Sequence, residues 1–235
     1  MTSPLVLGFL IGMRHALEAD HVAAVAALTA GTRSVGDAVW QGAVWGLGHT
    51  VPLFLFGSMV LVLDLAMPAR LAEALELAVG VMLIGLGMDV LRRLYRGQIQ
   101  IQRHRHADGM GDVHADTQPG SAQHDRGHHG QAQPKAFPSR ALFVGLMHGM
   151  AGSAALILLT IQSVQSPVLG LVYIVLFGAG SIAGMAALSV AIALPLRYQA
   201  NGAGWFHAGM HASIGVASVA LGGVLIYELA PRVLT

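Results

Sequence analysis

The chain has 235 residues, of which 54% are hydrophobic and only 11% are charged, whereas ordinary globular domains carry about 25% charged residues. This composition excludes a soluble globular protein and a mostly disordered one, and the net charge of +1 does not predict nucleic-acid binding. Because the chain has no cysteine, disulfides, thiolate metal sites and cysteine nucleophiles are excluded as well. We expect an all-α polytopic membrane protein embedded in a lipid bilayer.

Six apolar stretches are long enough to cross a bilayer, which takes about 20 residues. Turn residues such as Gly31-Thr32-Arg33-Ser34 and Ser166-Pro167 separate them. Charged residues inside the first stretch exclude a cleaved signal peptide. The chain is therefore predicted to form six transmembrane helices, at 4–30, 37–63, 71–95, 139–163, 168–195 and 206–230.

Residues 97–138 are rich in Gly, Gln and His and have almost no large apolar residues, so we expect a disordered loop. A flexible His-rich tract can bind divalent ions weakly, and an unstructured tether is the alternative interpretation. Half of the twelve histidines lie here, and we expect His104, His106, His128 and His129 to act as weak auxiliary metal ligands beside His114 and His124.

This loop divides the chain into two parts of three spans each, 1–96 and 139–235. Gly12-Met13-Arg14-His15 resembles Gly145-Leu146-Met147-His148, and a Gly-rich stretch ending at His49 has a parallel in the second half. Repeats with an odd number of spans must have opposite topology, as in many secondary transporters. We expect two inverted three-helix repeats, and chance similarity between Gly-rich segments is the alternative.

The positive-inside rule orients the chain. With the 97–138 loop in the cytoplasm, ten Lys and Arg residues fall on the cytoplasmic side and two on the other. We therefore expect both termini outside the bacterial cytoplasmic (inner) membrane.

The first span carries an unusual set of ionisable residues within eight positions: Arg14, His15, Glu18, Asp20 and His21. Such groups are costly in a membrane and must face a cavity, one another or a cation. On a regular helix His15, Glu18 and His21 share one face, so Asp20 joins them only at a kink or an unwound turn, or acts behind the ligands. Imidazole with carboxylate suits Ni, Co, Zn or Cu. A solvated helix tip is the alternative.

These residues carry a resemblance to a known family. The stretch from Arg14 to His21 resembles the His-x4-Asp-His signature of the nickel/cobalt transporter (NiCoT) family, and Leu47-Gly48-His49-Thr50 is similar to its second signature. The resemblance implies transport of nickel or cobalt across the bacterial cytoplasmic membrane. It also implies that His15, Asp20 and His21 are metal-site residues, with His49 close by.

The chain departs from the family pattern in two places. Ala26 and Ala27 stand where the family commonly has an Asp-Asn pair. The stretch 145–153 lacks the family's Asp and looks more like the shorter branch of urease-accessory membrane proteins, which six spans also suit. Because of these departures, the resemblance implies a metal site but does not fix which metal is carried or in which direction.

Three further histidines are candidates. His148 corresponds to His15 in the repeat and is expected to face the same cavity, while a hydrogen-bonded core histidine is the alternative. His207 and His211 share one helix face at i, i+4 spacing. We expect an interfacial pair in water, and an auxiliary metal site is the alternative.

The sequence has no HExxH helix, G-x-S-x-G elbow or P-loop lysine, so we predict no enzyme activity. We expect a transporter of nickel or cobalt, working as an importer, with no permanently bound cofactor and with a cytoplasmic nickel chaperone as a further partner. Efflux by the same fold is one alternative, and a non-transporting metal donor or scaffold is another. The expected metal ligands are His15, Glu18, Asp20, His21, His49 and His148.

Overall fold

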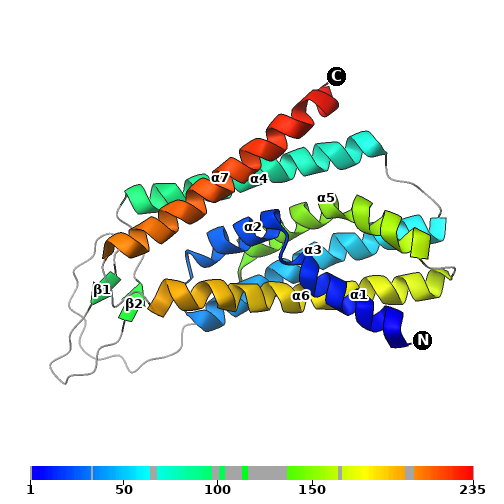
Figure 1. Cartoon of the computed structure of the whole chain (residues 1–235), viewed down its shortest axis with the longest axis horizontal. Helices are drawn as coiled ribbons and strands as arrows, with labels where there is room; N and C mark the ends of the chain where they lie inside the picture. Colours follow the sequence, from blue (N-terminus) through cyan, green and yellow to red (C-terminus); the bar gives the residue numbers. More distant parts are fainter. Residues whose placement is uncertain are drawn as a thin grey trace.

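The computed structural model describes residues 2–32, 34–63, 68–96, 101–103, 113–115, 137–163, 166–198 and 204–234. Over these residues the chain forms an elongated bundle of helices, with both termini in the same half of the bundle (Figure 1). The helices are α1 (Thr2–His15), α2 (Ala19–Thr29), α3 (Val35–Leu63), α4 (Ala69–Tyr95), α5 (Ser139–Ser163), α6 (Pro167–Tyr198) and α7 (Gly204–Leu234).

The all-helical prediction is confirmed, and five of the six predicted stretches each coincide with one helix among the described residues. Four helices among the described residues are long and apolar enough to cross a membrane, as expected of a membrane protein. They cover Val35–Leu61, Ala69–Tyr95, Val168–Arg197 and Ala208–Val233. The first predicted span is not one continuous helix, because α1 and α2 are separate and each is too short to cross alone.

The predicted loop contains a short antiparallel strand pair, which the expectation of a disordered segment did not include. Strand β1 (Ile101–Arg103) pairs with β2 (Val113–Ala115), with Gln102 opposite His114. The pair lies at the end of the bundle away from the termini (Figure 1). The rest of 97–136 lies outside the described residues.

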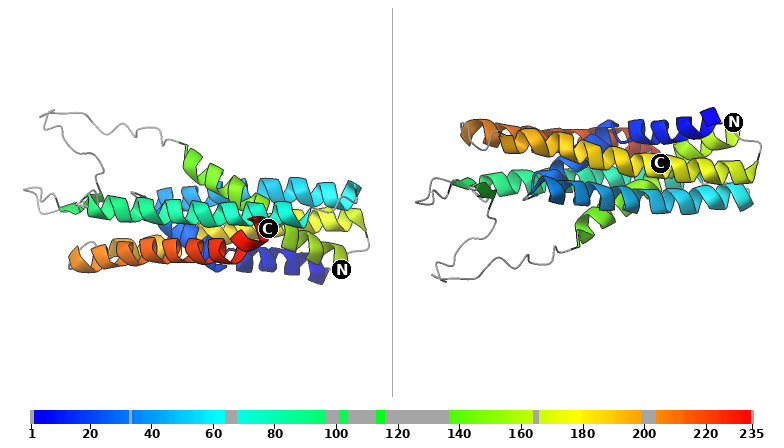
Figure 2. Two further views of the ribbon diagram at one scale, coloured as in Figure 1. Left: turned by 90° about the horizontal axis from the view of Figure 1, so that it is seen from above. Right: turned by 90° about the horizontal axis from the view of Figure 1, so that it is seen from below.

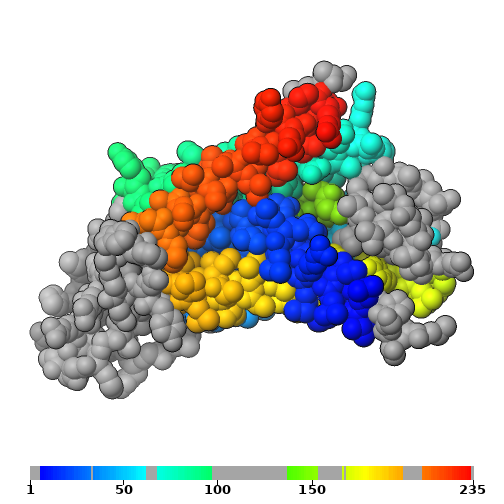
Figure 3. Space-filling view, in the orientation of Figure 1, coloured from blue at the N-terminus to red at the C-terminus, as the bar shows by residue number. Residues whose placement is uncertain are grey.

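The helices pack as two neighbouring groups (Figures 1 and 2). In one group α6 contacts both α1 and α3, and α3 also contacts α5. In the other group α4 and α7 pair along their length. The short helix α2 contacts α6 and α7, and its surface is visible between them in Figure 3.

Glycines set the closest helix contacts in the first group. At seven of the described glycines in this group an added Cβ would collide with a carbonyl oxygen of the facing helix, so only glycine lets the backbones approach this far. These contacts hold α6 against α1 and α3, and α5 against α3. The pairs are Gly12 with Phe177, Gly180 with Phe9, Gly184 with Met13, Gly42 with Met185, Gly145 with Trp45, Gly149 with His49, and Gly48 with Leu142.

Candidate metal centre

The centre begins at the interruption between α1 and α2. Helix α1 ends at His15, and tight backbone bonds from Leu17 N to the Arg14 carbonyl (2.9 Å) and from Glu18 N to the His15 carbonyl (3.1 Å) close the turn. Glu18 is extended, with φ −64° and ψ 147°, and α2 starts at Ala19. This is the unwound turn that the sequence requires if Asp20 is to reach the same place as His15. Asp20 then lies in the first turn of α2, where the helix dipole favours a carboxylate.

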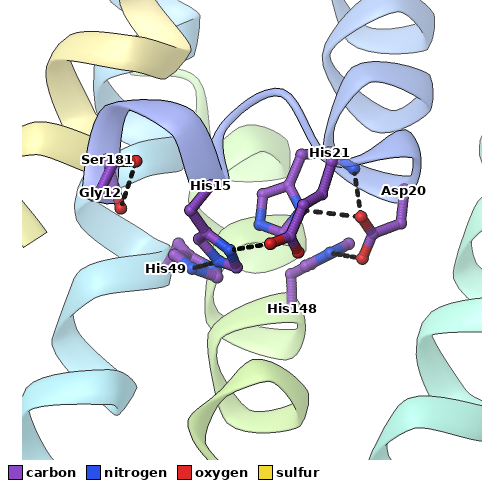
Figure 4. A network of polar contacts seen from close by, with 8 residues as sticks. Gly12, His15, Asp20, His21, His49, His148 and Ser181 are labelled. Carbon is purple, nitrogen blue, oxygen red and sulfur yellow. Dashed lines mark hydrogen bonds and ion pairs between the residues drawn. The ribbon is translucent and has the colours of Figure 1, made fainter. Parts of the chain in front are cut away.

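Four histidines from four helices meet at this turn (Figure 4). The His21 ring centroid lies 4.4 Å from that of His15, 5.0 Å from His49 and 4.3 Å from His148. His21, His49 and His148 are 1%, 0% and 2% exposed. The cluster therefore joins α1, α2, α3 and α5 in the interior of the bundle.

Two carboxylates hold three of these rings. His15 Nδ1 donates to Glu18 Oε1 at 2.8 Å, and His21 Nδ1 donates to Asp20 Oδ1 at 2.9 Å. His148 Nε2 donates to the other Asp20 oxygen, Oδ2, at 2.8 Å. Asp20 thus links α2 to α5, whereas the Glu18 side chain is 58% exposed and orients only His15. Figure 4 shows the Asp20 bridge between His21 and His148.

If the four imidazoles are neutral, three of their ring nitrogens have a lone pair that no hydrogen-bond donor among the described residues reaches. A neutral imidazole has one N–H and one lone pair, and an ionised carboxylate only accepts. The N–H groups of His21 and His148 donate to Asp20, and the N–H of His15 donates to Glu18. His15 Nε2 is therefore an acceptor, and His49 Nε2 donates to it across 3.2 Å. The remaining lone pairs are His21 Nε2, His49 Nδ1 and His148 Nδ1, and none of them has a hydrogen-bond partner among the described residues.

Two sets of possible ligands follow from the distances. In each set the ligand atoms lie within 4.8 Å of one another. One set is His15, His21 and His49, and the other is Asp20, His21 and His148. Within the described part of the chain, these two sets contain five of the six predicted principal ligands. Glu18, the sixth, reaches the cluster only through its bond to His15.

A cavity of about 400 Å³ opens beside the cluster. His15, Asp20, His21 and His148 line it, together with Arg14, Glu18 and Glu76. The cavity is also lined by residues from the first half of α4 (Ala72, Glu76 and Val79) and by Leu225 from the last half of α7. It therefore extends toward the half of the bundle that holds the termini.

Sequence reasoning missed three residues of the site. Trp45 is fully buried, with its ring 5.5 Å from His21 and 5.8 Å from His148. Phe177 lies 5.3 Å from His15, and Glu76 on α4 lines the cavity. The only available signal for Trp45 was its place one turn before His49 on the same helix.

His211 lies elsewhere. It is 2% exposed, and its Nε2 donates to the Ala30 carbonyl at 3.3 Å, near the C-terminal end of α2. The interpretation of His211 as a water-exposed interfacial residue is therefore wrong. The side chains of His207 and of His104, His106, His114, His124, His128 and His129 lie outside the described residues.

Comparison with known proteins adds one relative. The chain is 32% identical over 202 residues to the urease accessory protein UreH of Bacillus sp. (strain TB-90), covering 86% of this chain and 81% of the relative. The chain belongs to the UreH family. This membership supports the predicted resemblance at a coarse level, and it groups the chain with an accessory protein, not with an enzyme. No family model matches the chain, and no solved structure does.

Proposed function

We propose that this UreH-family protein carries a divalent transition-metal ion, nickel before cobalt, across the cytoplasmic membrane through the buried His/Asp cluster. The observation that carries the proposal is that His21, His49 and His148, gathered in one cluster, each have a buried ring nitrogen without a hydrogen-bond partner among the described residues. The relative is named as a urease accessory protein, which suits a role connected with nickel. In this proposal nickel or cobalt is the substrate, and the protein has no permanently bound cofactor.

A purely structural network would be arranged differently. Each buried polar group without a partner costs about 1–3 kcal/mol, and three such groups in one cluster would destabilise the fold. Lone pairs can be satisfied by a donor or by a cation. A divalent ion bound at one of the two ligand sets would use histidine nitrogens of this cluster, and the negative charge of Asp20 would offset part of the ion's desolvation.

The donor set favours borderline transition metals. Imidazole nitrogens suit Ni, Co, Zn and Cu, whereas Mg and Ca prefer oxygen ligands. The 3.2 Å between His15 Nε2 and His49 Nε2 matches two neighbouring ligands of one ion, which are about 3.0–3.4 Å apart at metal–nitrogen bonds of about 2.1 Å. For both atoms to bind an ion, the proton of His49 must move from Nε2 to Nδ1. Glu18 and Asp20 would fix the His tautomers from behind, as carboxylates do in metal sites.

We propose that the two halves, 1–96 and 139–235, are inverted repeats that rock against each other. The glycine contacts support this, because they are reciprocal: Gly12 faces Phe177 as Gly145 faces Trp45. Gly12 in the first half corresponds to Gly145 in the second half, and Phe177 in the second half corresponds to Trp45 in the first half. The helix contacts follow the same rule, since α1 packs on α6 as α5 packs on α3. Six spans then result if α1 and α2 together make the first span.

We propose that the ion enters through the cavity and leaves past the C-terminal end of α2, so that the site opens to one side of the membrane at a time. The cavity reaches the cluster from the termini end, and we propose that this end faces outside, because basic residues are in excess on the other side. At the other end of α2, Arg197 donates to the Thr32 carbonyl at 3.4 Å and His211 to the Ala30 carbonyl. Release toward the cytoplasm requires these contacts to open. Protonation of the histidines would promote release, because imidazole binds a metal only when neutral.

Import is the direction we propose, because the membrane potential favours entry of a dication by about 4.6 kcal/mol at 100 mV. Efflux uses the same site in reverse. A non-transporting donor, which passes nickel to a cytoplasmic chaperone through the His-rich segment, fits the accessory role of the relative as well. These three functions differ in where the metal goes.

Nickel accumulation in cells separates them. Cells that express the wild type, His21→Ala or a deletion of residues 100–135 are given radioactive nickel. Import predicts a gain that His21→Ala abolishes and the deletion only weakens. A loss of cellular nickel through the same residue establishes efflux. An effect of the deletion alone contradicts transport and supports the donor.

A further inference from the structure

On the basis of the proposed function, we propose that the cluster holds one ion at two alternate positions that share His21. The cavity triad, Asp20, His21 and His148, admits the ion. The deep triad, His15, His21 and His49, selects metals that prefer imidazole. The ion passes from the first to the second by exchanging ligands around His21.

The geometry separates the two positions. Ligands of one ion lie within about 4.2 Å of one another at bonds of about 2.1 Å. The ligand atoms of each triad come within 4.8 Å, so small side-chain movements suffice to close either triad on an ion. Among the described residues, no such set includes both His49 and His148, and their ring centroids are 5.9 Å apart. His21 neighbours both, with its ring centroid 5.0 Å from that of His49 and 4.3 Å from that of His148 (Figure 4).

Access gives the order of the two positions. All three residues of the cavity triad line the cavity, and His15 of the deep triad lines it as well, so His49 alone separates the deep triad from it. His49 does not line it and is fully buried, with Trp45 packed beside it at a ring distance of 6.4 Å. An ion that arrives through the cavity therefore meets Asp20 and His148 before it can reach His49.

The chemistry gives each position its role. The cavity triad includes a carboxylate, which attracts any divalent cation, including Mn²⁺ and other ions that favour oxygen. The deep triad has three imidazoles and no carboxylate, so it binds most tightly the ions that prefer nitrogen ligands. Because His21 serves both triads, two ions cannot be fully ligated at once. Admission and discrimination are thus divided between neighbouring residues.

Metal binding to the purified full-length chain in detergent tests this division. Ni²⁺ and Mn²⁺ are titrated by calorimetry, and X-ray absorption at the nickel edge counts the bound imidazoles. The variants are His49→Ala, His49→Gln and Asp20→Asn. Gly85→Ala is the control, because an added Cβ at Gly85 meets nothing within 4 Å.

We expect one Ni²⁺ per wild-type chain, bound by three imidazoles. Both His49 variants keep one Ni²⁺ bound by two imidazoles, and their preference for Ni²⁺ over Mn²⁺ falls by about tenfold or more. Asp20→Asn weakens both metals and leaves nickel with three imidazoles. The control behaves as the wild type.

Three results would overturn the inference. Two Ni²⁺ bound together would exclude a shared His21. Equal effects of the His49 and Asp20 variants on both metals, with the wild type binding one Ni²⁺, would show a single undivided site and leave the proposed function standing. A wild type that binds no Ni²⁺ would contradict the proposed function together with the inference.

Discussion

The two ends of α2 both meet histidines, but in opposite ways. At the N-terminal end His21 has a buried nitrogen without a hydrogen-bond partner among the described residues, and three more imidazoles surround it. At the C-terminal end His211 and Arg197 donate to backbone carbonyls, and the Arg93 side chain packs beside Gly31. One end therefore gathers lone pairs, and the other gathers donors.

The contrast between the two ends follows from the helix itself. Cations are stabilising near a helix C-terminus, where the last carbonyls lack partners, so the donors at that end form a cap. The histidines at the N-terminal end offer lone pairs, which suit a cation and not a helix end. The same residue type thus serves as a cap or as a candidate ligand, and the hydrogen-bond partners distinguish the two roles.

The largest expected effect is at the N-terminal end of α2. His21→Ala removes the residue common to both candidate ligand sets, so nickel affinity should fall by more than about 100-fold, beyond the 10–100-fold typical of outer partners. Calorimetric titration of the purified chain measures it. His211→Ala is the matched control at the other end, and it should keep one bound Ni²⁺ while lowering the free energy of unfolding by about 1–3 kcal/mol. Equal losses of nickel affinity in both variants would show that the histidines at the two ends of α2 do not differ in their role.

This contrast was only partly predictable from the sequence. The helix ranges follow from apolar stretches, and the grouping of His15 with His21 follows from their spacing. His148 was expected there from the internal repeat, and His49 from the resemblance to a known family. The interruption after His15 does not, because Ala16, Leu17 and Glu18 are good helix formers and contain no Gly or Pro signal.

The role of His211 was not predictable either. Its i, i+4 spacing to His207 describes one helix face, whereas its hydrogen-bond partner, the Ala30 carbonyl, is 181 positions away in the chain. Contacts of this kind come from tertiary packing. The same holds for Trp45, whose burial against the cluster depends on how α3 meets α2 and α5.

Glu18→Gln should have the next largest effect. Glutamine keeps the size of the side chain but removes the charge that holds His15 Nδ1 at 2.8 Å. Nickel affinity should fall by about 10–100-fold with one ion still bound, because the carboxylate orients a ligand without binding the metal itself. Calorimetry measures the affinity, and an unchanged imidazole count by X-ray absorption confirms the indirect role. Complete loss of binding would instead make Glu18 a direct ligand.

A smaller effect is expected from packing behind the cluster. An added Cβ at Gly149 collides with the His49 carbonyl, so Gly149→Ala should push α5 away from α3 and cost about 1–3 kcal/mol of unfolding free energy. Gly85→Ala has open space and should be neutral or stabilising by up to about 1 kcal/mol. Thermal unfolding in detergent compares the two. Equal stability of the two variants would show that α5 and α3 are not held at this distance.

The smallest effect is expected at the cap. Arg197→Met removes a long hydrogen bond of 3.4 Å to the Thr32 carbonyl and should cost less than about 1 kcal/mol of unfolding free energy. Nickel affinity should stay within about twofold of the wild type, because Arg197 lies at the far end of α2 from the cluster. A large loss of affinity, measured by the same calorimetric titration, would show that the two ends of α2 are coupled more tightly than their hydrogen bonds indicate.

Nickel uptake into sealed proteoliposomes tests the central claim most directly, because no chaperone or other partner is present. The purified wild type, His21→Ala and the deletion of residues 100–135 are reconstituted, and radioactive nickel inside the vesicles is measured with an interior-negative potential. The account predicts uptake by the wild type and by the deletion, and none above empty vesicles for His21→Ala. Equal uptake by the wild type and His21→Ala, or no uptake by the wild type, would contradict it.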